Sequence, residues 1–214
     1  MKTQREIRQE MTAICHQMYA KNLITSTDGN ISVRVGENKM LITPSGIHKG
    51  FIKLDDFVLT DLNGNLLQGT RRASQEISMH VGAYQSRPDI GAVIHAHPVH
   101  CIAFTMAGVS LGEDYLPEVI LSVGKIPIVP YTTPTTDEVP AQIKSYLHNY
   151  NAMILDRHGS LTVGKSLQEA YNLLERIEHV AQTVFLARQL GPIKRLQPHE
   201  LSKLQALLET SKAP

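Results

Sequence analysis

The stretch Gly91-Ala92-Val93-Ile94-His95-Ala96-His97-Pro98 decides the fold of this chain. The β-branched residues Val93 and Ile94 favour an extended, buried strand, and the proline ends it. Side chains alternate between the two faces of a strand, so His95 and His97 share one face. Because imidazole is the commonest metal ligand in proteins, two imidazoles on one face of a rigid strand can converge on one ion. The alternative is a pair of ordinary histidines near the end of a strand.

The 214-residue chain has an ordinary globular composition, with 42% hydrophobic and 19% charged residues. No linker rich in Gly, Ser, Pro or charge divides it, so we predict one domain over residues 1–214. The net charge is +1 with both signs interspersed, which gives no indication of a nucleic-acid partner. The N-terminus is polar and no apolar run approaches the ~20 residues of a transmembrane helix, so we expect no membrane association. Cys15 and Cys101 are too few for a disulfide framework, which favours a cytoplasmic protein.

Hydrophobic periodicity predicts the elements on either side of the histidine strand. Helices are expected over about 5–22, 75–84, 99–106, 140–150 and 170–185, with a weaker one through 201–208. Strands are expected over 31–35 and 39–43 as one hairpin, 57–62 and 66–68 as another, and then 126–130, 152–155 and 161–163. Strands that occur both in hairpins and in alternation with helices indicate an α/β layered domain on a mixed or antiparallel sheet.

A carboxylate precedes the second helix. We expect Ser74 to be the N-cap of the helix that carries Ile77, Val81 and Tyr84, which places Glu76 in its first turn. The helix dipole stabilises a carboxylate there, typically by about 0.3–1 kcal/mol. That effect alone would explain Glu76.

One more histidine follows a strand, His158. Three imidazoles and one carboxylate suit a divalent transition metal, and the candidate ligands are Glu76, His95, His97 and His158. Four unrelated polar residues remain the alternative, because the chain contains 10 histidines. His80 lies one helical turn after Glu76 and is a candidate for a contact that supports a ligand. His100, beyond the proline, is the weaker rival ligand.

Two polar loops that contain glycine adjoin the first hairpin. They are Thr25-Ser26-Thr27-Asp28-Gly29-Asn30 and Thr43-Pro44-Ser45-Gly46. Backbone N–H groups and hydroxyls in two such loops can hold a phosphate. Turn formation alone also explains each loop.

Five motifs carry a resemblance to a known family. They are Thr27-Asp28-Gly29-Asn30-Ile31-Ser32, Ile42-Thr43-Pro44-Ser45-Gly46, Ala73-Ser74-Gln75-Glu76, Val93-Ile94-His95-Ala96-His97 and Arg157-His158-Gly159. In order and spacing they resemble the class II aldolase/adducin family, and within it the aldolases of L-fuculose 1-phosphate. The resemblance covers the chain to about Leu190. It is specific for the family and much less specific for the reaction.

The resemblance implies a three-layer α/β/α fold with a central, largely antiparallel sheet. It implies Zn²⁺, or another divalent metal such as Mn²⁺ or Co²⁺, on the three histidines, with Glu76 as fourth ligand and catalytic base. It also implies a homotetramer with active sites at the subunit interfaces. Gln75 stands where the fuculose phosphate aldolases have a second serine. The residues expected to hold a substrate phosphate are Asn30, Ser45, Gly46, Ser74 and Gln75.

The implied reaction is the reversible cleavage of a ketose 1-phosphate to dihydroxyacetone phosphate and an aldehyde, through a metal-stabilised enediolate. The resemblance places a catalytic tyrosine of a neighbouring subunit near Tyr115, and Glu118 is a competing candidate. The tail after Gly191 has no tyrosine, although the fuculose enzyme uses one there. Alternatives are a sugar-phosphate 4-epimerase, dehydratase or decarboxylase of the same fold, or a non-catalytic adducin-like interaction module.

Overall fold

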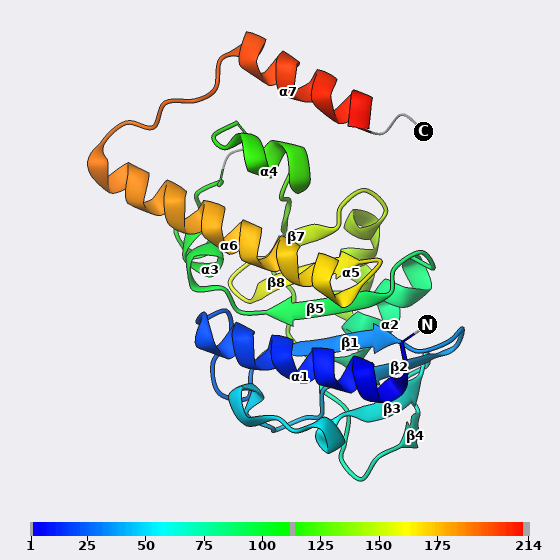
Figure 1. Cartoon of the computed structure of the whole chain (residues 1–214). Coiled ribbons are helices and arrows are strands. Elements are labelled where there is room, and N and C mark those ends of the chain that lie inside the picture. The colour runs from blue at the N-terminus through cyan, green and yellow to red at the C-terminus, as the bar shows by residue number, and fades with distance from the viewer. Residues whose placement is uncertain (1, 112–113, 212–214) are drawn as a thin grey trace.

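One sheet organises the structure, a computed structural model that describes residues 2–111 and 114–211 (Figure 1). Its eight strands in the described residues lie in the order β4-β3-β2-β1-β5-β8-β7-β6. Neighbouring strands are antiparallel except β6 and β7, which are parallel. The strands are β1 (Asn30–Arg34), β2 (Lys39–Ile42), β3 (Val58–Asp61), β4 (Leu66–Gln68), β5 (Ala92–Ala96), β6 (Ile128–Val129), β7 (Ala152–Leu155) and β8 (Gly159–Gly164). The predicted, largely antiparallel sheet is therefore confirmed.

Helices cover both faces of this sheet, which gives the predicted three-layer α/β/α architecture. On one face lie α1 (Gln4–Ala20), α3 (Val99–Met106) and α6 (Leu167–Leu190), and on the other lie α2 (Ile77–Ser86) and α5 (Glu138–Leu147). Two shorter turns, η1 (Lys49–Phe51) and η2 (Leu54–Asp56), connect β2 to β3. Helices α4 (Pro117–Ser122) and α7 (Pro198–Ser211) contact each other beyond the sheet (Figure 1).

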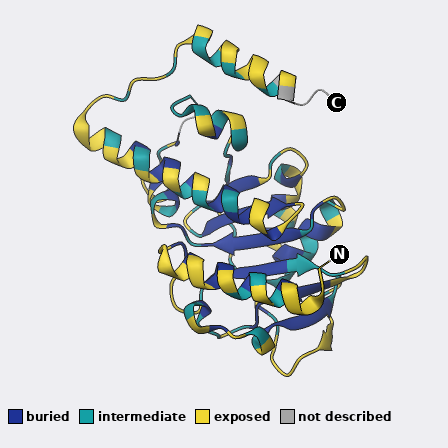
Figure 2. Cartoon of the chain, in the orientation of Figure 1, coloured by how far each residue is buried: buried dark blue, intermediate teal, exposed yellow. Residues whose placement is uncertain are grey.

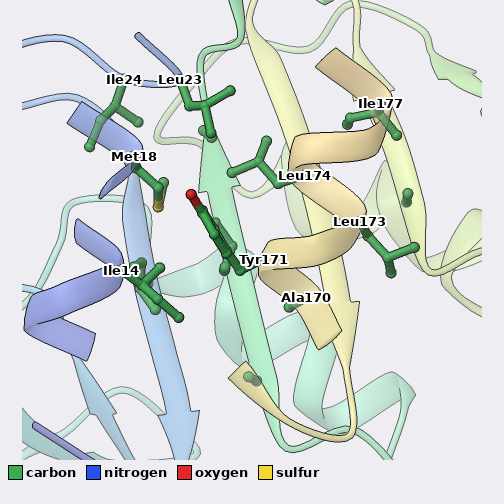
Figure 3. Packing of buried hydrophobic residues seen from close by; sticks show 14 of the residues in the cluster. Ile14, Met18, Leu23, Ile24, Ala170, Tyr171, Leu173, Leu174 and Ile177 are labelled. Atoms are coloured by element: carbon green, nitrogen blue, oxygen red, sulfur yellow. The ribbon is translucent and has the colours of Figure 1, made fainter. Parts of the chain in front are cut away.

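The packing of α1 and α6 follows their sequence pattern. Apolar residues three and four positions apart form one face of each helix, and they meet over the sheet (Figure 3). Met18 of α1 and Leu174 of α6 are almost completely buried in this layer. Burying one such side chain contributes about 1.5–3 kcal/mol. The outward faces of both helices are exposed, while the strands between them and the opposite layer are buried (Figure 2).

The start of α2 differs from the sequence prediction. Ser74 is not the N-cap, because the helix begins at Ile77 and Glu76 occupies the cap position with φ −98° and ψ 22°. The backbone N–H of Ser74 donates to the Thr43 carbonyl (3.1 Å), and Ala73 bridges to Pro44. These contacts hold the chain extended as far as Ser74, and residues 75 and 76 form a turn, so the helix starts only at Ile77. As a result, the Glu76 side chain lies at the helix entrance.

Three further boundaries differ from those expected. Helix α4, with Pro117 at its first position, was not predicted. Strand β6 has two residues instead of the expected five, and α5 begins at Glu138, ahead of Pro140. Proline at the start of a helix lacks only an N–H that would have no intrahelical partner, so it marks a beginning here and not a break. No helix within the described residues is long and apolar enough to span a membrane.

Gly159 joins the turn after β7 to β8, and replacing it with alanine should destabilise the protein. A Cβ atom there would lie 2.3 Å from the Ala96 carbonyl oxygen and 2.9 Å from His97 Cδ2. Overpacking of this kind costs about 1–3 kcal/mol, and the obstacle here is backbone that cannot move freely. Urea unfolding should show the loss as a lower midpoint with an unchanged slope. Gly36→Asn is the control, since no atom lies within 4 Å of a Cβ there and asparagine tolerates its φ of +73°.

Candidate functional site

Three histidines converge where β5 ends and β8 begins. These antiparallel strands pair Ala96 with Ser160, which brings the residues flanking that pair to one edge of the sheet. His95 lies on β5, His97 follows it, and His158 precedes β8. One ring nitrogen from each histidine lies within 4.8 Å of one from each of the other two. The sequence predicted the shared face of His95 and His97, and the strand pairing adds His158.

Hydrogen bonding fixes the tautomer of His95. Its Nδ1 lies 2.9 Å from the carbonyl oxygen of Ser160, and a carbonyl only accepts, so Nδ1 carries the proton. The ring is completely buried, and burial lowers the pKa of His95 to about 3, which keeps it neutral. Its Nε2 therefore presents a lone pair, 2.9 Å from Nε2 of His97. A neutral imidazole with its second nitrogen held by a backbone carbonyl is the usual state of a histidine ligand.

Glu76 completes the cluster from the entrance of α2. Its carboxylate lies 3.1 Å from Nε2 of His158 and 3.4 Å from the lone-pair nitrogen of His95. Burial raises the pKa of Glu76, but the electrostatic effect of the adjacent His95 imidazole and the hydrogen bonds from His158 and Asn30 outweigh it, so the pKa lies below its usual range. A carboxylate that faces a lone pair brings two acceptors together, and a cation between them turns this repulsion into attraction. Three nitrogen donors and one oxygen donor fit a divalent transition metal.

A chain of buried polar groups holds Glu76 in place. Asn30 on β1 donates from Nδ2 to the Glu76 carboxylate (2.8 Å), and its Oδ1 accepts from Nε2 of His80 (2.5 Å). Nδ1 of His80 then accepts from the Ser32 hydroxyl (2.6 Å), which in turn accepts from Tyr84 (3.0 Å). Burial lowers the pKa of His80 to about 4, so the ring stays neutral, with one nitrogen that donates and one that accepts. Every hydrogen bond in this chain of polar groups is therefore donated toward Glu76. His80 thus supports Glu76 through Asn30.

Asp28 and a second nitrogen of His158 also lie beside the cluster. A carboxylate oxygen of Asp28 lies 3.7 Å from Nδ1 of His97, so a negative charge adjoins that ring. Nδ1 of His158 is buried and has no hydrogen-bond partner within the described residues. His100, the rival ligand, points elsewhere, because its Nδ1 lies 2.7 Å from the carboxylate of Glu178 on α6.

A cleft of about 470 Å³ opens beside the cluster. Glu76, His97 and His158 line it, together with all five residues that the sequence suggested for a phosphate: Asn30, Ser45, Gly46, Ser74 and Gln75. Lys49 and the loop residues Pro134 and Thr135 also line the cleft, and sequence reasoning missed them. A lysine in a polar loop is normally solvated, so nothing in the local sequence marks Lys49 as buried.

Tyr115 and Glu118 do not lie in this cleft. Tyr115 lines a separate pocket with Asp114 and Arg188, and the Arg195 guanidinium stacks over its ring at 5.5 Å. Glu118 is exposed on α4. Neither residue lines the cleft of its own chain.

An α/β/α domain with three histidines and a glutamate at the edge of its sheet defines a class of proteins, and comparison with known proteins identifies that class. The sequence pattern described as "Class II Aldolase and Adducin N-terminal domain" matches residues 9–185. The chain belongs to the class II aldolase/adducin family. The family's enzymes are lyases and related catalysts that use a divalent metal, and the histidine cluster is able to bind one.

Relatives within the family differ in reaction. The chain is 34% identical to L-fuculose phosphate aldolase of Methanococcus maripaludis strain C7 over 177 residues, 83% of this chain and 95% of the relative. It is 28% identical to 3-oxo-tetronate 4-phosphate decarboxylase of Escherichia coli K12 over 211 residues, 96% of this chain and 98% of the relative. A solved L-fuculose 1-phosphate aldolase superposes with a TM-score of 0.85 at 30% identity, covering 97% of each chain.

Proposed function

We propose that this single-domain protein is a metal-dependent aldolase. It reversibly cleaves a ketose 1-phosphate, similar to L-fuculose 1-phosphate, to dihydroxyacetone phosphate and an aldehyde. The observation that carries the proposal is the contact of Glu76 with two of three converging histidines at the wall of a polar cleft. The small size and polar lining of this cleft suit a phosphorylated sugar.

His95, His97 and His158, with Glu76, are the proposed ligands of Zn²⁺, or of Mn²⁺ or Co²⁺ in its place. When bound, such an ion supplies a Lewis acid that polarises a substrate carbonyl oxygen. The neutral state of His95 favours this role, because an imidazole must be deprotonated at the nitrogen that binds a metal. Zinc also accepts four ligands of these types.

Glu76 is the proposed catalytic base and acid. Its carboxylate is ionised and held by Asn30, so it can accept a proton from a hydroxyl or carbon of a substrate in the cleft and return it later. Asn30, Ser45, Gly46, Ser74 and Gln75 would hold the phosphate with backbone and side-chain donors, and so fix the reacting carbon beside Glu76.

The proton donor for the aldehyde fragment is proposed to come from a second copy of the chain. Tyr115 is the first candidate and Glu118 the second, since both lie on the surface beside α4 and outside their own cleft. This proposal includes a homotetramer with active sites between subunits, in the cytoplasm.

A decarboxylase acting on a sugar-acid phosphate is the second candidate. The alignment with the 3-oxo-tetronate 4-phosphate decarboxylase favours it, because that relative matches 96% of this chain. The two reactions share a need to stabilise negative charge beside a carbonyl, so the same ligands would serve both. Their products differ, since one releases an aldehyde and the other carbon dioxide.

The products of the zinc-loaded protein distinguish these reactions. We expect L-fuculose 1-phosphate and related ketose 1-phosphates to yield dihydroxyacetone phosphate, detected by coupled reduction. 3-Oxo-tetronate 4-phosphates should release no carbon dioxide. Carbon dioxide without dihydroxyacetone phosphate would overturn the aldolase proposal in favour of the decarboxylase. An isomerised or dehydrated sugar phosphate would indicate an epimerase or dehydratase, and protein that takes up no metal would favour an adducin-like interaction module.

A further inference from the structure

Lys49 is a buried cation beside the candidate cluster. It begins η1, directly after the loop that contains Ser45 and Gly46, and only 2% of the residue is exposed. Burying an ammonium group is costly unless hydrogen bonds or opposite charges compensate it. Lysine is rarely buried to this extent, so its surroundings should reveal what holds the charge.

Two backbone carbonyls accept hydrogen bonds from Lys49. Its Nζ lies 2.7 Å from the oxygen of Thr27 and 2.9 Å from that of Ile47. Among the described residues, no carboxylate forms an ion pair with it within 4.0 Å; Asp28 and Glu76 act on it from farther away. An ammonium group has three N–H donors, and the two carbonyls use two of them. The third donor has no hydrogen-bond partner among the described residues, and neither carbonyl neutralises the positive charge.

The lining of the cleft shows which ligand would use that charge. Lys49 is the only lysine or arginine among the described residues that form the walls, and it lies among the neutral donors of Ser45, Gly46, Ser74 and Gln75. Neutral donors alone leave the charge of a bound dianion uncompensated. One ammonium group among them supplies a charge-assisted hydrogen bond, which is about twice as strong as a neutral one.

We propose that Lys49 binds the phosphate of the substrate and makes the cleft selective for phosphorylated over unphosphorylated sugars. This inference rests on the proposed action on a sugar phosphate. The two carbonyls come from different loops, the one before β1 and the one after β2, so they also fix the position of the ammonium group. Lys49 therefore adds to the phosphate site a charge that its other members lack.

The alternative is that Lys49 only ties the two loops together. Lys49→Gln separates the two roles, because its side-chain amide keeps two N–H donors for the carbonyls but has no charge. Lys49→Met removes both the charge and the donors. Lys39→Met is the matched control. Lys39 is exposed on β2 and does not line the cleft, so this substitution removes the same charge from a different place.

The test measures binding of inorganic phosphate and of glycerol 3-phosphate to the zinc-loaded protein by calorimetry, at constant ionic strength and with metal content determined for each variant. We expect Lys49→Gln to weaken both ligands by about 10- to 100-fold, the range for losing a hydrogen bond to a charged group. Lys39→Met should bind as the wild type does, and glycerol should show no dependence on Lys49. Circular dichroism establishes that the variants are folded.

Equal phosphate binding by the wild type and folded Lys49→Gln would overturn the inference and leave Lys49 as a structural tie. Failure of the wild type to bind either ligand would overturn it as well. If Lys49→Met fails to fold, Lys49→Gln still decides. Activity is measured separately: Lys49-dependent phosphate binding without aldolase products would leave this inference standing and reject the proposed reaction.

Discussion

Glu76→Gln is expected to lower the turnover of the zinc-loaded protein by about 10²- to 10⁴-fold, the usual contribution of a general acid–base group. Glutamine has the same shape, and Asn30 can still donate to its amide oxygen, so the cluster should keep its geometry. What is lost is a carboxylate able to accept and return a proton. Steady-state turnover together with metal content checks this, and metal content should stay near one ion per chain.

The control for Glu76→Gln is Glu37→Gln, which removes a carboxylate from the exposed turn between β1 and β2. Its turnover should match that of the wild type. If Glu76→Gln kept turnover within tenfold of wild type with full metal content, Glu76 would not be the base. Loss of metal in this variant would mean that Glu76 acts mainly as a ligand.

His95→Ala is expected to abolish stoichiometric metal binding, and activity with it. His95 is completely buried, and its lone-pair nitrogen faces both His97 and Glu76. Alanine offers no atom that could bind the metal in place of this nitrogen. Elemental analysis after zinc reconstitution and removal of excess metal checks the result. Because the truncation also leaves a cavity in the core, His97→Gln is a second variant at a less buried ligand.

His100→Gln is the matched control for metal binding. His100 was the rival ligand in the sequence, but its ring lies against Glu178, and glutamine can preserve a hydrogen bond to that carboxylate. This variant should retain its metal. Loss of metal in His100→Gln, or full metal content in both folded His95→Ala and folded His97→Gln, would contradict the proposed ligand set.

The sheet and the histidines could be predicted because they depend on short-range patterns. A period of two placed His95 and His97 on one face, and apolar runs bounded by turns gave the strands that flank them. His158 was predicted as a ligand because it lies at the end of a predicted strand, as His97 does. Each of these inferences needs only a few consecutive residues, and the sheet then fixes their spatial relation.

The remaining features depend on contacts between segments far apart in sequence. The start of α2 is set by a backbone bond from Ser74 to Thr43, which no helix-capping rule takes into account. Asn30 reaches both Glu76 and His80 only because α2 packs against the face of the sheet. Lys49 can be buried because a carbonyl from another loop, that of Thr27, accepts a hydrogen bond from its ammonium group. None of these contacts leaves a local pattern for sequence analysis to detect.

One wall of the cleft comes from a loop that contributes none of the candidate metal ligands. Pro134 and Thr135 lie in the loop between β6 and α5, where Thr135 has a φ of +65°. The four candidate ligands come from β5, from the residue that follows it, and from the segments leading into α2 and β8. Mutations in that loop can therefore alter which fragment the cleft accepts without disturbing the ligands. In evolutionary terms, a loop that lines the cleft without holding a ligand is a segment where substitutions would leave the proposed metal centre intact.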